Sequence, residues 1–123
     1  MFPLRALRFA LLLTLLGTAG CASENKGKIE GKKWRSCTAT VKGQSLSDGA
    51  LHLEFKTDGG LVYRARNQVF RGTYTLGPGK SVILNLDREL AGRKSHTESV
   101  EIRGDRLFMT DSDGTSLMFY EDQ

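Results

Sequence analysis

The sequence predicts an all-β protein, an antiparallel up-and-down meander of about eight strands that closes into a small barrel. Three observations lead to this fold class. Apolar and polar residues alternate with a period of two, which is the period of a strand and not of a helix. Short runs rich in glycine, aspartate and asparagine separate the alternating segments. A sheet of this size would expose two edges if it stayed open, and closure removes them.

The first strand of the domain is expected to begin near Trp34 and to run to about Val41. Its inward face is ambiguous, because Trp34 alternates with polar residues such as Ser36, whereas Cys37 and Val41 belong to the apolar set. A bulge between Trp34 and Cys37 would bring both side chains inside. The following segment, 42–49, is predicted as a loop.

The stretch 51–76 carries the clearest strands. In its first part the apolar residues Leu51, Leu53 and Phe55 fall on one face, because successive side chains of a strand point to opposite faces. Two further strands alternate in the same way, and short turns rich in Asp, Asn and Gly separate the three. The expected strands are 51–56, 61–66 and 69–76.

The remainder of the chain repeats this pattern. Its tight turns contain Gly-Pro-Gly, Gly-Asp and Asp-Gly sequences. The one longer connection, 88–94, is expected to be a charged loop, with a single helical turn as an alternative. A two-sheet sandwich is less consistent with the sequence, since only 42–49 and 88–94 are long enough to cross between sheets. The expected strands are 81–87, 94–102, 106–110 and 115–120.

Residues 1–20 are predicted to be an export signal and not part of the domain. Arg5 and Arg8 form a positively charged start, and the apolar run 9–16 follows. That run is shorter than the roughly 20 residues of a membrane-spanning helix. Thr18-Ala19-Gly20-Cys21 comes next and resembles the lipobox of bacterial lipoproteins, in which the cysteine carries the lipid.

This resemblance implies that Cys21 bears acyl chains such as palmitate and anchors the protein to a membrane. Residues 21–30 would then be the lipidated N-terminus and a flexible tether, and residues 31–123 the barrel domain. The expected location is the cell envelope, on the periplasmic side of the outer membrane. The alternative is ordinary cleavage after Ala22, which would give a secreted or soluble periplasmic protein.

Net charge argues against a nucleic-acid partner. The chain has 18 basic and 14 acidic residues, and Arg5 and Arg8 lie in the signal. The remaining 16 basic residues give a mature chain of about +2, without the dense basic stripe that such a partner needs. Lysines gather in 26–33, where they form either a solvated tether or a contact with anionic lipid headgroups.

No catalytic or metal-binding set is predicted, and no cofactor. If Cys21 carries lipid, Cys37 has no disulfide partner and is expected to be an inert buried thiol. His52 and His96 are expected on the surface. The run 111–114 (Asp-Ser-Asp-Gly) lacks the spacing of a calcium loop and is predicted to be a hairpin turn. We therefore do not expect an enzyme.

Several of these features together resemble the lipocalin-like small barrels, and in particular the short paralogous exported proteins of Gemmata-type planctomycetes. The resemblance extends over 31–121, and it implies a binding module on a closed barrel. The residues that carry it are Gly31 and Trp34, Phe55, Asp58 and Gly59, Gly72 and Tyr74, and Leu107, Asp111, Asp113, Gly114, Leu117 and Phe119.

Two functional hypotheses follow. In the first, a small hydrophobic ligand is held between Trp34, Phe55, Tyr63 and Tyr74 inside the barrel. In the second, the interior is filled with side chains, as an eight-stranded barrel permits. The protein is then an interaction module, such as an inhibitor of an envelope enzyme or an assembly factor. Its partner would contact the loops 42–49 and 88–94, and the candidate residues, all in the second loop, are Arg88, Arg93 and Lys94.

Overall fold

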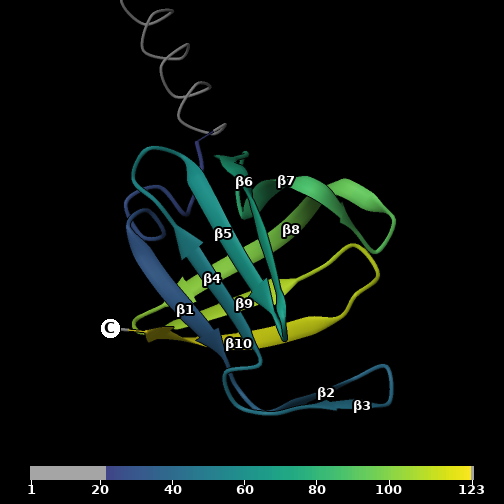
Figure 1. Ribbon diagram of the computed structural model, residues 1–123. Helices are drawn as coiled ribbons and strands as arrows, with labels where there is room; N and C mark the ends of the chain where they lie inside the picture. The colour runs from purple at the N-terminus through teal and green to yellow at the C-terminus, as the bar shows by residue number, and fades with distance from the viewer. Residues whose placement is uncertain (1–21, 123) are drawn as a thin grey trace, which may run out of the picture.

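The computed structural model describes residues 22–122, and within this range eight of ten strands close into one antiparallel barrel (Figure 1). The order around the barrel is β1-β10-β9-β8-β7-β6-β5-β4, so β1 pairs with both β4 and β10. The strands are β1 (Lys32–Ser36), β2 (Ala39–Val41), β3 (Gln44–Leu46), β4 (Leu51–Phe55), β5 (Gly60–Ala65), β6 (Gln68–Leu76), β7 (Ser81–Leu90), β8 (Arg93–Arg103), β9 (Arg106–Thr110) and β10 (Ser116–Asp122).

The predicted fold class is confirmed. Within residues 22–122 the secondary structure is entirely strand and turn, and no helix there is long and apolar enough to cross a membrane. The predicted export signal, 1–20, and the predicted lipid site, Cys21, lie outside the described residues.

The alternation in 51–76 produces the expected meander. Leu51, Leu53 and Phe55 are buried, and the residues between them are partly exposed. Inward residues from every barrel strand continue this core around the cylinder. Its members are Ile29, Trp34, Leu51, Leu53, Phe55, Leu61, Phe70, Tyr74, Val82, Leu84, Leu86, Val100, Leu107, Met109 and Phe119.

The first strand corrects one prediction. β1 ends at Ser36 and pairs regularly with β4 and β10, so it has no bulge that would turn Cys37 inward. Ser36 is fully buried in its place, because its hydroxyl accepts a hydrogen bond of 3.0 Å from the Leu51 backbone N–H. A buried polar group is tolerated when it is paired in this way. Cys37 is half-buried and has no disulfide partner among the described residues.

Neither of the two predicted loops is an irregular loop. The segment 37–49 contains the β2–β3 hairpin, a separate two-stranded sheet that projects from one end of the barrel (Figure 1). In 88–94, β7 continues to Leu90 and β8 begins at Arg93, so the turn is only Ala91-Gly92 and no helical turn forms. Both turn residues have positive φ, +54° and +81°, which suits the twist of a two-residue hairpin loop.

The β7–β8 pair loses its register between Asn85 and Leu90. Up to Asn85 the two strands pair regularly, whereas the stretch from 86 to 89 faces a single residue of β8. On the other side of β7, a Cβ atom at Gly72 of β6 would lie 1.8 Å from the Asn85 carbonyl oxygen, so only glycine allows this close approach. The irregularity interrupts the regular pairing of β7 and β8 at one end of the barrel.

The segment 22–31 corrects another prediction, because it is not a flexible tether. It closes the end of the barrel that carries the β4–β5 and β6–β7 turns. Ile29 is fully buried in the core, and the Asn25 carboxamide donates to the carbonyls of Val100 (3.1 Å) and Lys80 (3.3 Å). Backbone bonds attach the segment at both ends, from Glu24 N–H to Gly79 and from Gly31 N–H to Phe55. We call residues 22–31 the plug.

The plug makes a measurable contribution to stability. We expect Ile29→Ala to lower the free energy of unfolding by about 2–4 kcal/mol, because it removes a buried side chain and leaves a cavity. Chemical denaturation followed by circular dichroism measures this change. Lys28→Ala, at an exposed neighbour, is the matched control and should cost less than about 0.5 kcal/mol. Equal effects of the two substitutions would contradict a packed plug.

Candidate functional site

The barrel is hollow at the end opposite the plug. The β7–β8 and β9–β10 turns lie at this end, where a cavity of about 170 Å³ opens between β5, β7, β8, β9 and β10. Its inner wall is apolar and its rim is polar. We call it the open-end pocket, and it is lined by Tyr63, Leu84, Leu86, Leu90, Ala91, His96, Glu98, Met109, Asp111, Thr115 and Leu117.

The lost register of β7 and β8 explains the position of the pocket. Leu86 is the first residue of the irregular stretch 86–89, Leu90 follows that stretch, and both line the cavity. Arg88, between them, would point inward by strict alternation, but it is exposed. Its guanidinium lies 4.3 Å from the centroid of the Phe70 ring and donates to the Val69 carbonyl at 2.8 Å. A cation over an aromatic face is a favourable contact, so Arg88 covers the edge of the core beside the pocket.

Glu98 is the most unusual residue of the pocket. It is only 9% exposed, and within the described part of the chain its Oε2 atom has no hydrogen-bond partner. Burial raises the pKa of its carboxyl group to about 7, and the nearby Asp111 and Asp113 add to this effect while Arg93 opposes it. On the facing strand, burial and the charge of Glu98 raise the pKa of Tyr63 to about 12.

A second, more polar cavity of about 290 Å³ adjoins the pocket at its rim and shares Ala91, His96, Glu98 and Asp111 with it. We call it the outer cavity. The β2–β3 hairpin reaches it through Lys42, whose Nζ lies 2.7 Å from Oδ2 of Asp113. The Asp111 carboxylate accepts hydrogen bonds from the backbone N–H groups of Asp113 and Thr115 and thereby fixes the β9–β10 turn. The hairpin turn predicted for 111–114 is confirmed.

The two histidines have different surroundings. His96 is half-buried at the rim, and its Nε2 lies 2.8 Å from the Arg93 carbonyl oxygen. His52 is on the outer face of β4, where its Nδ1 lies 3.8 Å from Oδ2 of Asp122. Among residues 22–122, no three His, Cys, Asp or Glu side chains gather as they would around a metal ion.

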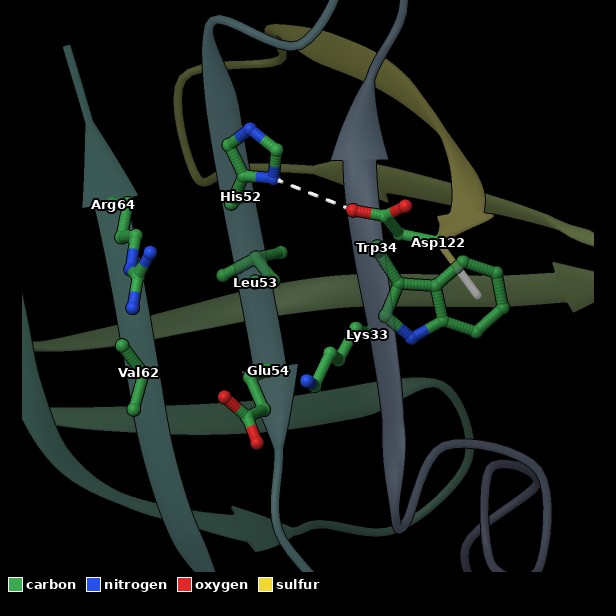
Figure 2. Close-up of a pocket in the computed structure, with 8 residues that line it drawn as sticks. All are labelled: Lys33, Trp34, His52, Leu53, Glu54, Val62, Arg64 and Asp122. Atoms are coloured by element: carbon green, nitrogen blue, oxygen red, sulfur yellow. Dashed lines mark ion pairs between the residues drawn. The ribbon is translucent and has the colours of Figure 1, made fainter.

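A separate groove of about 240 Å³ runs over the outer face of β1, β4 and β5 (Figure 2). Its side chains alternate in charge, and the figure places Lys33 beside Glu54 and the His52–Asp122 pair above them. Trp34 and Leu53 also line the groove, although both are buried. Because the basic and acidic side chains of this groove neutralise each other, the groove does not favour a ligand of either charge.

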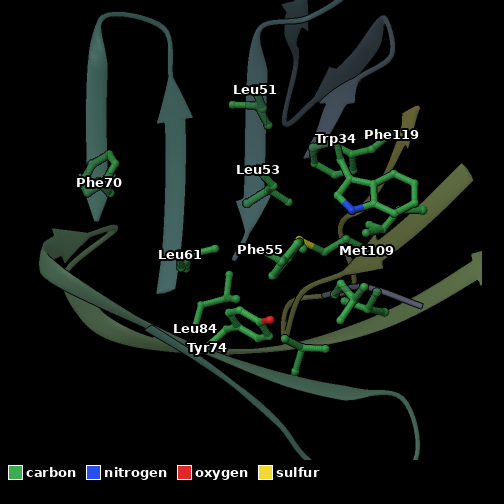
Figure 3. Close-up of a cluster of buried hydrophobic side chains, with 14 of the residues drawn as sticks. Trp34, Leu51, Leu53, Phe55, Leu61, Phe70, Tyr74, Leu84, Met109 and Phe119 are labelled. Carbon is green, nitrogen blue, oxygen red and sulfur yellow. The ribbon is translucent and has the colours of Figure 1, made fainter. Parts of the chain in front are cut away.

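The four residues predicted to hold a ligand do not line one cavity. Trp34, Phe55 and Tyr74 are buried in the packed core (Figure 3). Phe55 and Tyr74 make an edge-to-face contact with centroids 5.0 Å apart, and the Tyr74 hydroxyl donates to the Lys56 carbonyl at 2.6 Å. Only Tyr63 lines the open-end pocket.

The three residues predicted to bind a partner lie at the same end as the pocket. Arg88, Arg93 and Lys94 are all exposed, on the last part of β7 and the first part of β8. Arg93 lines the outer cavity together with Lys42 from the other predicted loop. The structure therefore brings the segments 42–49 and 88–94 together around the open end.

Sequence reasoning missed the main members of the pocket, Glu98, Leu90, Met109 and Leu117, as site residues. A signal for Glu98 was present, because it has the same parity as the inward Val100 and Ile102. A glutamate that shares a strand face with apolar residues is expected either at the rim of the barrel or in a functional site. No comparable signal marked the cavity, since it depends on the register of β7 against β8.

Comparison with known proteins gives no relative: no family model, no curated protein and no solved structure matches this chain. The candidate site therefore rests on its own geometry.

The raised pKa of Glu98 predicts a pH-dependent stability. The folded protein holds this proton up to about pH 7, whereas an ordinary glutamate releases it near pH 4.5. Its contribution to stability is therefore complete below about pH 4.5 and is lost as the pH rises toward 7. Between pH 5 and pH 8 we expect the wild type to lose about 1–3 kcal/mol more than Glu98→Gln.

Chemical denaturation at a series of pH values measures this difference. Glu101→Gln is the control, because hydrogen bonds from Lys80 and Arg103 lower the pKa of Glu101. Its replacement should not remove the loss between pH 5 and pH 8. Parallel curves for the wild type and Glu98→Gln would show that Glu98 titrates like a solvated carboxylate.

Proposed function

We propose that this protein is a non-catalytic cell-envelope lipoprotein whose barrel binds a small, partly apolar molecule in the open-end pocket. The observation that carries the proposal is the combination of an apolar cavity with a buried carboxyl group that lacks a complete set of partners. Binding sites for small molecules are typically apolar clefts with a few fixed polar groups, and mouths of β-barrels are a common place for them.

The volume of the pocket limits the ligand. A dry cavity of about 150 Å³ lined by apolar side chains can hold benzene, so 170 Å³ accommodates an apolar group of that size. The adjoining outer cavity, of about 290 Å³, leaves room for a polar part of the same molecule. The proposed ligand is therefore amphipathic and much smaller than a fatty acid with a long chain.

The side chains around the pocket favour binding over catalysis. His96 makes its contact with a backbone carbonyl and not with a nucleophile. Asp111 is bound by backbone N–H groups of its own turn, and Cys37 does not line the pocket. A general base needs a nucleophile within hydrogen-bond reach, held in turn by a third group, and the lining residues do not supply this arrangement.

Export and lipidation at Cys21 are the part of the proposal that sequence alone supports, through the lipobox-like Thr18-Ala19-Gly20-Cys21 and the resemblance to exported planctomycete proteins. Anchoring through acyl chains would keep the barrel at the membrane surface, since each buried methylene contributes about 0.8 kcal/mol.

Metabolic labelling with a clickable palmitate analogue in a bacterial host tests this part. We expect the label on the wild-type protein and its complete loss in Cys21→Ala, because the thiol of Cys21 is the proposed attachment point. Cys37→Ala, at the other cysteine of the chain, is the matched control and should keep the label. A mature, unlabelled protein that begins at Ser23 would instead show ordinary cleavage after Ala22.

A second variant pair tests the pocket. We expect the wild type to bind benzyl alcohol, and Leu90→Trp to weaken this binding at least about tenfold by filling the cavity with a larger ring, a loss of about 1.4 kcal/mol. Val69→Trp is the control, because Val69 lies on the outside of β6 and is 39% exposed. Isothermal titration calorimetry on the folded proteins measures the affinities. Equal affinities in all three proteins would place the ligand elsewhere.

The alternative function, a protein-interaction module, also has support in the structure. The β2–β3 hairpin stands outside the barrel, and its Lys42 lines the outer cavity together with the exposed Arg93 at the open end. An exposed strand edge can pair with a strand of another protein. If no small molecule enters the pocket, this end remains the best candidate surface. Pull-down from an envelope extract with Arg88, Arg93 and Lys94 neutralised would then identify it.

A further inference from the structure

We infer that the ligand of the open-end pocket is a small apolar amine, whose ammonium group binds the Glu98 carboxylate and whose apolar part lies among the leucines of the inner wall. This inference rests on the proposed function, because it assumes that the pocket is a binding site, and it adds the chemical class of the ligand.

The position of Glu98 is the first argument. Its side chain belongs to β8, is more than nine-tenths buried and lines both the open-end pocket and the outer cavity. Oε2 has no hydrogen-bond donor among the described residues. Leaving a buried acceptor unpaired costs about 1–3 kcal/mol, and more for a charged group. A ligand that donates a hydrogen bond at this point would remove the cost.

The charges around Glu98 are the second argument. Tyr63 faces it from β5, Arg93 and His96 belong to its own strand, and the turn after β9 supplies Asp111 and Asp113. Lys42 is already paired with Asp113.

Two carboxylates, Glu98 and Asp111, thus share the rim with one nearby guanidinium, that of Arg93. This excess of negative charge favours a cation over an anion. A ligand carboxylate would have to lie beside Glu98 and would be repelled. A neutral alcohol could donate a hydrogen bond, but it would not gain the charge interaction, which is stronger in a partly buried site.

The apolar wall of the pocket determines the size and the apolar character of the rest of the ligand. Leu84, Leu86 and Met109 belong to the core, and the partly buried Leu90 and Leu117 pack against it and also line the pocket. The space between them fits one ring of six carbons or a short alkyl chain. Benzylamine combines a group of this size with an ammonium group one carbon away, and it has close neutral and anionic analogues. It is therefore a suitable probe.

The protonation of Glu98 gives a distinctive signature. In the free protein the pKa of this carboxyl group is about 7, so at pH 6 most molecules must release a proton before the carboxylate can pair with an ammonium group. We expect the affinity for benzylamine to rise about tenfold between pH 6 and pH 8, because the charged fraction of Glu98 rises by about that factor. The affinity for benzyl alcohol should change much less.

The experiment is calorimetric titration of the lipid-free barrel domain with its plug, residues 22–123, with benzylamine, benzyl alcohol and phenylacetate at pH 8. Because residues 22–122 pack around one core, this part includes every element that the structure describes. We expect benzylamine to bind at least about tenfold more tightly than benzyl alcohol, as a charge-assisted hydrogen bond implies. Phenylacetate should bind most weakly.

Glu98→Gln should reduce the affinity for benzylamine to that of benzyl alcohol, while Glu54→Gln, in the outer groove, should leave both unchanged. If Glu98→Gln does not fold, the wild-type affinities at pH 6 and pH 8 decide the question without a variant. An amine that binds no better than the alcohol, or an affinity for it that does not depend on pH, would overturn the inference and leave the proposed function standing. Failure of all three probes to bind would overturn the proposed function itself.

Discussion

The whole fold depends on the pairing of β1 with two strands that are distant in sequence. β1 contributes only five residues, yet it bonds β4 on one side and β10 on the other. Without it the meander would be an open sheet with two unpaired edges, and such edges lead to aggregation. Trp34 fixes this strand in place, because its side chain is fully buried in the core, and Ser36 accepts a hydrogen bond from the first residue of β4. Closure therefore rests on a few residues near the beginning of the domain.

The part of the fold that follows from local alternation was predictable, and the part that depends on tertiary contacts was not. The strands of 51–76 and the turn at 111–114 were predicted correctly, because an inward face with period two and a glycine-containing turn are visible in the chain itself. The inward face of β1 was not predictable, because Ser36 becomes acceptable inside only through its contact with Leu51. The plug was not predicted from the sequence, because Ile29 is the one large apolar residue in an otherwise polar segment.

The site shows the same division. The aromatic residues that predicted a ligand cavity are mostly core residues, since large rings fill a narrow cylinder well. The cavity exists where β7 and β8 lose their register, and no feature of residues 86–90 indicates this irregularity. Glu98 could have been predicted as a site residue, because it falls on the same strand face as the inward Val100. Its importance, however, depends on neighbours from β5 and from the turn after β9, which only the folded chain brings together.

If Cys21 carries a lipid, as we propose, the plug also determines how the protein sits on a membrane. The Ala22 carbonyl accepts a hydrogen bond of 3.2 Å from the Gly79 backbone N–H, so the residue that follows Cys21 is already attached to the sealed rim. A lipid on Cys21 would leave almost no slack, since one residue spans at most about 3.6 Å. The cylinder would then stand on the bilayer with its sealed face down and its mouth toward the aqueous compartment. A ligand would therefore enter the open-end pocket from the aqueous side and not from the lipid. This direction of entry suits a ligand that carries a charge.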